Sequence, residues 1–155
     1  MNKIELTQGK YTIIDDEDYK IFSKFKWCVS NGYAVRRVGG RKNQKTLLLH
    51  REIMKTAGAM DTDHINGDKL DNRRSNLRVV TRSQNMANVP KRVNNKSGYK
   101  GVSWKESHKM WRSTIKVNGK SVHLGYSDNK VDASKLYNIG AIKYFGEYAL
   151  LNNNG

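Results

Sequence analysis

The chain has 155 residues, of which 37% are hydrophobic, and this composition favours two small modules over one deep core. Its 29 lysine and arginine residues outnumber 14 aspartate and glutamate residues, so the formal net charge is +15 at pH 7 and a polyanion such as nucleic acid is the expected partner. The single cysteine, Cys28, excludes an internal disulfide and a CxxC-type structural zinc site, and no apolar run approaches the roughly 20 residues of a membrane span, so we expect a cytoplasmic protein without membrane contact.

Residues 1–49 read as short strands joined by turns. The β-branched run in KYTII is predicted to be a strand that ends in an acidic turn at DDED. Asn31-Gly32 separates two strand-like runs and is a strong hairpin signal, because both residues tolerate positive φ. TLLLH is predicted to be a further strand ending at His50, whose imidazole would make a local hydrogen bond or contact a phosphate. Trp27 and the neighbouring cysteine are expected in the core.

The segment HREIMKTAGA (50–59) is predicted to be a short helix. DHI, which begins at Asp63, reads as the end of a strand, and the following Asn-Gly pair reads as a turn. RSQNMAN, which begins at Arg82, reads as the start of a helix with Thr81 or Ser83 as its N-cap. The polar loop between strand and helix contains three residues that we interpret as turn formers: Asn66, Asp71 and Asn72.

Beyond the only proline, Pro90, the pattern changes. Residues 90–96 are basic, lack apolar periodicity and read as a flexible linker. GYKGVSW, KMWRSTIKV and KSVHLGY are rich in aromatic and β-branched residues, which predicts a three-stranded antiparallel meander. VDASKLYNIGAIKYFG is amphipathic at helical spacing and ends at Gly146. The predicted apolar face of this helix consists of Ala133, Leu136, Tyr137, Ile139 and Ile142.

The stretch DHINGDKLDNRRSNLRVVTRSQN (63–85) combines residue types that suit phosphodiester cleavage. An imidazole is a good base near neutral pH, and carboxylate and amide oxygens are ligands for a hard cation such as Mg²⁺. Asp63 could supply a ligand and His64 a base if the strand ends or twists there, because adjacent strand residues point to opposite faces. Two simpler interpretations stay open. Asp63, His64 and Asn85 could form a turn and a helix cap, and the arginines of the stretch could be a solvated face.

The same stretch resembles the HNH homing-endonuclease family of phages and bacteria. The resemblance rests on LHR before the stretch, on His64, on Asn76 twelve residues later and on Asn85 twenty-one residues later. It implies a ββα-metal nuclease fold in which His64 is the general base and Asn76 holds the loop or His64 in position. It also implies that Asp63 and Asn85 bind one divalent metal, Mg²⁺ or Mn²⁺, and that the products carry 5′-phosphate and 3′-hydroxyl ends. We expect a monomer, which would nick one strand per visit.

Residues 97–152 resemble the APETALA2/ethylene-response DNA-binding domain of plants, through YKGVSW, WRSTIKVNGK, HLGY, an alanine-containing helix and KYFGEYALLN. Lysine or serine stands at several positions that carry arginine in the plant proteins. Lysine cannot make the bidentate contact of arginine with guanine, so we expect phosphate affinity with loose base preference. The resemblance implies that the sheet binds double-stranded DNA through Lys100, Ser103, Trp104, Lys105, Arg112, Thr114, Lys116, Ser121 and His123. In the preceding part of the chain, backbone contacts are expected from Arg51 and Arg82.

Together these features predict an α+β protein with two modules and a linker. The first is an HNH nuclease domain with N-terminal strands (1–89) and a ββα-metal core at about 47–88. A basic linker (90–96) then leads to a small three-stranded antiparallel sheet plus helix (97–152). The expected function is metal-dependent, homing-type DNA cleavage targeted by the C-terminal sheet. A non-catalytic sequence-specific DNA-binding regulator is the main alternative, and an RNA-binding or RNA-cleaving protein is another.

Overall fold

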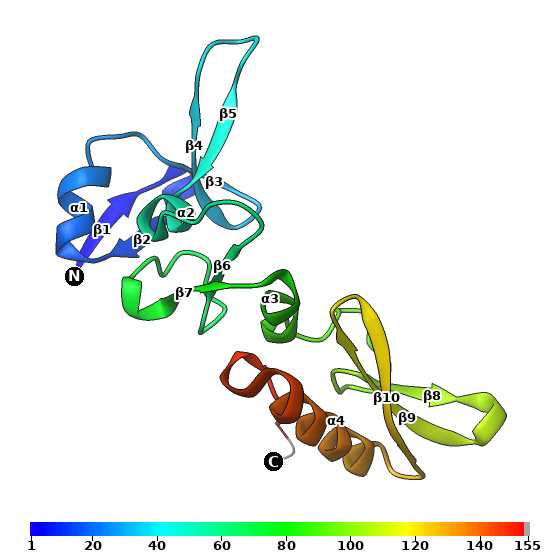
Figure 1. The fold of residues 1–155 in the computed structure, drawn as a ribbon. Coiled ribbons are helices and arrows are strands. Elements are labelled where there is room, and N and C mark those ends of the chain that lie inside the picture. The colour runs from blue at the N-terminus through cyan, green and yellow to red at the C-terminus, as the bar shows by residue number, and fades with distance from the viewer. Residues whose placement is uncertain (154–155) are drawn as a thin grey trace. The chain divides into compact units, whose positions relative to one another are not determined.

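The computed structural model describes residues 1–153, which form a mixed α/β architecture of small antiparallel sheets and helices (Figure 1). The chain divides into two compact units, Met1–Arg82 and Ser83–Gly155. The functional modules predicted from the sequence divide the chain differently, and their boundaries stay a prediction. Within the described residues, no helix combines the length and the apolar character needed to cross a membrane.

The first unit consists of short elements that form three small antiparallel sheets. β1 pairs with β2, β4 lies between β3 and β5, and β6 pairs with β7. The elements are β1 (Asn2–Glu5), β2 (Tyr11–Ile14), α1 (Asp16–Phe22), β3 (Cys28–Ser30), β4 (Tyr33–Val38), β5 (Lys45–Leu48), α2 (Leu49–Met54), β6 (Asp61–His64) and β7 (Leu77–Val80). α3 (Arg82–Asn88) follows β7 and spans the boundary between the two units.

The predicted hairpin at Asn31-Gly32 is confirmed. β3 and β4 pair directly on either side of these residues. Asn31 has φ of +50° and Gly32 has φ of +83°, a left-handed conformation that glycine adopts freely and asparagine tolerates. The dipeptide therefore fixes the register of this hairpin.

Two secondary-structure predictions for the first unit are wrong. One assigned the start of a helix to a turn, and the other assigned the start of a helix to a strand. The acidic residues after β2 open α1 rather than a turn, since carboxylates are favoured at the positive end of a helix dipole. The first turn of α1 contains Asp16, Glu17 and Asp18. The predicted strand TLLLH becomes helical at Leu49, so His50 is a residue of α2 and not the end of a strand. The helix ends at Met54, before the residues predicted to close it.

The core of the first unit draws on most of its elements. Its buried side chains are Ile4, Leu6, Ile14, Trp27, Ala34, Leu49, Ile53 and Leu77. Trp27 is buried as predicted, and its indole N–H donates to the Phe22 carbonyl (2.9 Å). Cys28 is only partly buried. Because Leu77 of β7 belongs to this core, the β6–β7 hairpin is anchored against the rest of the unit.

The second unit is a three-stranded sheet packed against one long helix (Figure 1). It contains β8 (Val102–Lys105), β9 (Met110–Val117), β10 (Lys120–Ser127) and α4 (Lys130–Phe145). β9 lies between β8 and β10, which confirms the predicted meander, and Asn118-Gly119 forms the turn before β10. The side chain of Asn129 caps α4 by accepting from the Val131 N–H (2.7 Å), and the helix ends at Gly146 as predicted.

The buried face of α4 differs from the predicted one. Ile139 and Ile142 are 65% and 56% exposed, so their prediction as core residues is wrong. The core is formed by Ala87, Ile115, Tyr137, Ala141 and Phe145. A Cβ at Gly140 would lie 2.6 Å from a methyl carbon of Leu124, so a larger residue where the helix meets β10 would require the Leu124 side chain to shift. The close approach selects small residues for the buried face, which weakens the apolar periodicity of the sequence.

Candidate active site

Asp63 and His64 lie where β6 stops and a turn begins. In the antiparallel register, Asp63 is opposite Arg78 and His64 is opposite Leu77. The strand ends at His64, and Gly67 follows with φ of +77°. Both Asp63 and His64 are buried, and each contacts a different set of neighbours. The strand ends at these residues, which is the condition under which Asp63 and His64 could both take part in one reaction.

His64 is buried in a cluster of rings. The residue is 5% exposed, and its ring centroid lies 5.0 Å from that of His50 on α2 and 6.1 Å from that of Tyr33 on β4. Burial lowers the pKa of His64, and the hydrogen bond with Asn72 and the charge of Asp63 offset this only in part. The ring is therefore neutral at pH 7, which is the form that accepts a proton.

His50 makes the folded protein sensitive to acid. Burial lowers its pKa from 6.5 to about 3, and His64 and Arg51 act in the same direction. Because the folded-state pKa lies below the unfolded one, the stabilising contribution is complete above pH 6.5 and is lost as the pH falls toward 3. We expect His50 to lower the free energy of unfolding by about 2 kcal/mol when the pH falls by about 1.5 units below its ordinary pKa.

Urea unfolding at neutral pH and at about pH 5 tests this expectation. The matched variant His50→Phe keeps an aromatic ring but has no titrating group. It should therefore lose less stability on acidification than the wild-type protein, and an equal loss in both proteins would contradict the prediction. His64 also has a lowered pKa, so the His50→Phe protein keeps part of the acid sensitivity.

Asn72 contacts the His64 ring, and sequence reasoning missed it. Its Oδ1 lies 3.2 Å from His64 Nε2, and its Nδ2 donates to Thr12 Oγ1 of β2 (2.7 Å). Asn72 is 1% exposed, so its interpretation as an ordinary turn residue is wrong. A buried asparagine and a turn asparagine look alike in a sequence, and no local pattern distinguishes them.

Asn76 fastens the loop that follows β6. Its Nδ2 donates to the Asp71 carbonyl (2.8 Å), and its Oδ1 accepts from the Asn66 backbone N–H (3.0 Å). Its own carbonyl accepts from the Ile65 N–H (2.9 Å). The side chain therefore connects both ends of the loop, which is the geometry that a loop-holding role requires. The effect of Asn76 on catalysis stays a prediction.

The predicted metal ligands lie in different units. Arg78 donates from Nε and Nη2 to Asp63 Oδ2 at 3.0 and 2.9 Å, and this ion pair is largely buried. Asn85 lies in α3, beyond the boundary that follows Arg82. Its role as a second ligand stays a prediction.

Two arginines of the loop before β7 are held by carboxylates. Arg73 makes a bidentate pair with Asp71 at 2.7 and 2.6 Å, and Arg74 makes one with the buried Asp18 at 2.7 Å for both bonds. The hydrogen bond from Arg73 lowers the pKa of Asp71. These arginines therefore hold the loop and α1 together, and do not form a freely solvated face.

The two arginines predicted to contact DNA lie around one carboxylate. Arg51 and Arg82 approach Asp61 to 3.7 and 3.8 Å. The Arg82 side chain is 83% exposed and that of Arg51 is 31% exposed. The long ion pair of the exposed Arg82 contributes little to stability, so this cation can turn toward a phosphate at small cost. Arg51 is half-buried and also donates to the Met60 carbonyl (3.3 Å).

The oxygen donors beside His64 suit a hard cation. Within residues 1–153, no three His, Cys, Asp or Glu side chains gather as a metal-binding group. A hard cation takes carboxylate and amide oxygens and water as ligands, and the role of Asp63 as such a ligand stays a prediction. Mg²⁺ and Mn²⁺ accept such ligand sets, whereas structural zinc uses four nitrogen or sulfur ligands.

The sheet of the second unit has a face that α4 does not cover. Side chains alternate along a strand, and the buried Val102, Ser113 and Ile115 mark the side toward the helix. In the described part of the chain, no carboxylate forms an ion pair with the cations of the opposite side. The register brings together on that opposite side Ser103, Lys105, Arg112, Thr114, Lys116, Ser121 and His123.

Two other predicted DNA contacts lie elsewhere. Trp104 pairs with Trp111 on the side that faces α4, with ring centroids 5.3 Å apart, and its indole N–H donates to Glu106 (2.7 Å). The Lys100 ammonium donates to the Ala87 carbonyl, and burial lowers the pKa of Lys100 to about 8. The structure thus does not bring Trp104 and Lys100 onto the face that carries the other predicted contacts.

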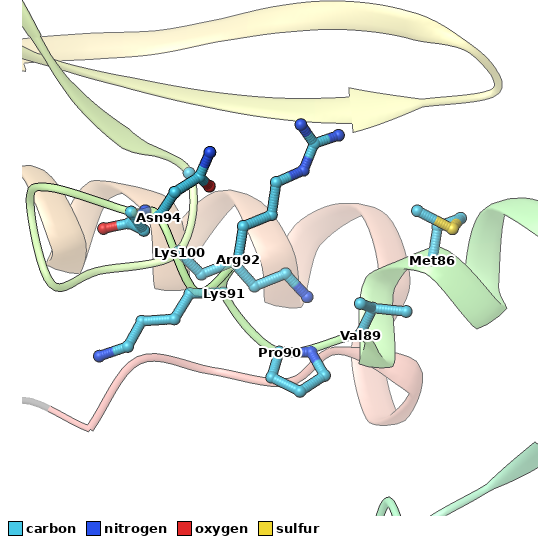
Figure 2. Close-up of a pocket in the computed structure, with 9 residues that line it drawn as sticks. Met86, Val89, Pro90, Lys91, Arg92, Asn94 and Lys100 are labelled. Atoms are coloured by element: carbon cyan, nitrogen blue, oxygen red, sulfur yellow. The ribbon is translucent and has the colours of Figure 1, made fainter. Parts of the chain in front are cut away.

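A hollow of about 340 Å³ lies beside the basic segment after α3 (Figure 2). Its apolar lining comes from Met86, Val89 and Pro90, and its basic lining from Lys91, Arg92 and Lys100. The Lys91 ammonium donates to the Gly98 carbonyl (2.6 Å), so this segment folds back on itself. Residues 90–96, predicted to be a linker, thus present cations around a concave surface.

A neutral, buried imidazole beside a carboxylate, in a strongly basic protein, is a site suited to hydrolysis of nucleic acid. The HNH endonuclease family model matches residues 58–87. Over 152 residues the chain is 30% identical to an uncharacterized HNH endonuclease of Acanthamoeba polyphaga mimivirus, an alignment that covers 94% of this chain and 76% of that protein. Over 58 residues it is 40% identical to protein 3.8 of Escherichia phage T7, covering 37% of this chain and 48% of that protein. No solved structure matches the chain. The chain belongs to the HNH endonuclease family and is a nuclease.

Proposed function

We propose that this protein is a metal-dependent DNA endonuclease of the homing type, with His64 as its general base. The observation that carries the proposal is the buried, neutral His64 ring, held against Asn72 and directly beside Asp63. The segment matched by the family model supports it, because that segment includes all four residues of the predicted motif. The fold proposed for this part of the chain is ββα-metal, formed by β6, β7 and α3.

In the proposed reaction, His64 takes a proton from the water that attacks phosphorus. The new bond joins the water oxygen to phosphorus, and the bond to the 3′ oxygen breaks. That oxygen leaves with a proton from solvent, which gives 5′-phosphate and 3′-hydroxyl ends. Asn76 keeps the loop closed, and Arg51 and Arg82 hold the DNA backbone through its phosphates.

Asp63 and Asn85 are the proposed ligands of one divalent metal per chain. A bound Mg²⁺ or Mn²⁺ supplies positive charge for the phosphate and the leaving oxygen. The two hydrogen bonds from Arg78 fix the orientation of the Asp63 carboxylate. With one site per chain, a monomer would cut one strand per visit.

A supercoiled-plasmid assay with excess protein tests the proposed reaction. We expect conversion to open circles with Mg²⁺ or Mn²⁺, and no conversion with EDTA. Linear product at early times would contradict the nicking monomer. Binding without cutting, if it persisted with Mn²⁺ and with DNA from the natural host, would overturn the catalytic proposal in favour of a DNA-binding regulator.

The sheet of the second unit, within residues 97–152, is the proposed targeting surface, as in the APETALA2-type domain that it resembles. Unpaired cations on the uncovered face support this, since they are free to release counterions from DNA. Residues 90–96 precede this sheet in the chain, and their concave basic surface is proposed to contact the DNA backbone.

Lys116→Ala tests the targeting surface. We expect weaker DNA binding, and a plot of log affinity against log salt whose slope falls by about 1, because one phosphate contact is removed. Lys135→Ala removes the same charge from α4, where Lys135 pairs with Asp132, and should leave both quantities nearly unchanged. Equal effects of the two substitutions would show that only net charge matters and would contradict a specific surface.

A further inference from the structure

The hydrogen bonds behind His64 form a chain whose direction can be worked out atom by atom. Thr12 Oγ1 lies 2.7 Å from the Leu70 carbonyl oxygen, which can only accept. The single hydroxyl proton of Thr12 is therefore directed to Leu70. Toward Asn72, at 2.7 Å, Thr12 Oγ1 must accept, and only the amide NH₂ of Asn72 can donate.

This direction determines which end of the Asn72 amide meets the imidazole. With its nitrogen on Thr12, the amide directs Oδ1 to His64 Nε2 at 3.2 Å. An amide oxygen can only accept, so Nε2 must carry a proton in this contact. In a neutral imidazole the lone pair is then on Nδ1.

The backbone holds the chain of bonds in place. The Asn72 N–H donates to the Ile13 carbonyl (2.8 Å), and the Ile13 N–H donates to the Leu70 carbonyl (2.9 Å). Thr12 and Asn72 are 0% and 1% exposed, so water does not compete for these groups.

We propose that Thr12 and Asn72 are positioning residues that fix His64 in the tautomer protonated on Nε2, so that Nδ1 is the nitrogen that accepts the proton of the attacking water. This inference rests on the proposed function. It gives the β1–β2 hairpin a role in catalysis, because Thr12 of β2 acts on the site through Asn72. Neither residue is proposed to touch the DNA or the water.

The first test reads the tautomer of the His64 ring directly in the wild-type protein, and a variant serves only to assign the signals. Long-range ¹H–¹⁵N correlation spectra of the labelled full chain, without metal, report which ring nitrogen is protonated. His64→Ala assigns the signals among the four histidines of the chain. We expect a pyrrole-type Nε2 and a pyridine-type Nδ1 for His64. A wild-type ring protonated on Nδ1 would overturn the inference, whether or not the protein cuts DNA.

The second test uses variants of nearly equal size. In Thr12→Val the amide of Asn72 loses its acceptor and can turn over, so we expect mixed tautomers and a kcat lowered about tenfold or more, with KM little changed. Thr12→Ser keeps the hydroxyl and should restore both the tautomer and kcat. Thr46→Val, at an exposed position of β5, controls for the loss of a threonine hydroxyl elsewhere. Each variant is compared at a temperature below its own unfolding transition.

The outcomes separate the inference from the function on which it rests. A folded Thr12→Val protein with wild-type kcat and an unchanged tautomer would overturn the positioning role. Asn72→Leu removes the acceptor toward Nε2 and should lose the tautomer. If the wild-type protein shows the expected tautomer but cuts no DNA under any metal condition, the proposed function fails and the catalytic role of the tautomer fails with it.

Discussion

Replacing His64 with alanine is expected to reduce the rate of DNA cleavage by about 10²- to 10⁴-fold, because a positioned general base contributes about that much. DNA binding should persist, since the cations proposed to hold the backbone are elsewhere on the protein. Single-turnover conversion of supercoiled plasmid to open circles at saturating protein measures the cleavage rate, and a filter-binding or mobility-shift assay measures DNA binding. Together the two measurements distinguish a loss of catalysis from a loss of DNA binding.

The control for this prediction is another histidine. His108 is exposed in the second unit, where its ring stacks on Tyr126 with centroids 4.6 Å apart. His108→Ala should keep the cleavage rate at saturating DNA. Because His64 is buried, the unfolding temperature of His64→Ala must be measured too, and His64→Asn fills more of the vacated space. A rate near that of the wild-type protein in either His64 variant would exclude this residue as the base.

Replacing Gly101 with alanine is expected to destabilise the second unit by about 3 kcal/mol or more. Gly101 has φ of +73°, a conformation that is strained for any residue with a Cβ. The added Cβ would also lie 2.6 Å from the Thr114 carbonyl oxygen and would overlap the ring of Tyr137. Tyr137 is 3% exposed and belongs to the core between the sheet and α4, so moving its ring would disturb the packing of that core.

Gly98→Ala is the matched control for this substitution. Gly98 has φ of +83°, but a Cβ there would meet no atom within 4 Å. It should therefore cost only the backbone strain, about 1 kcal/mol. Urea unfolding of both variants measures the difference, which isolates the steric overlap from the conformational strain. A loss of stability in Gly101→Ala no larger than that in Gly98→Ala would contradict the packing seen around Tyr137.

The elements that could be predicted from the sequence are those fixed by local conformational preference. Asn31-Gly32 specifies its hairpin because left-handed φ values are costly for most other residues. Gly146 ends α4 for a related reason, with φ of +52°. The start of α1 was open to misreading, because acidic residues suit both a turn and the first turn of a helix.

The burial of α4 could not be predicted from periodicity alone. Its sheet-facing surface selects small side chains such as Gly140 for close approach, while Ile139 points to solvent. A hydrophobicity pattern counts the exposed isoleucine as core and overlooks the buried glycine. Packing distance, and not apolar character, decides which side of this helix is buried.

For the candidate site too, part could be predicted from the sequence and part is visible only in the tertiary structure. The spacing of His64, Asn76 and Asn85 indicated a nuclease because it resembles the motif of the HNH family, and the residue types at these positions suit proton transfer and binding of a hard cation. Tertiary structure alone decided that Asn72 is buried against His64 and that Thr12, sixty residues earlier in the chain, orients its amide. The direction of a hydrogen bond depends on which donors and acceptors meet in space, and that information is absent from the order of residues along the chain.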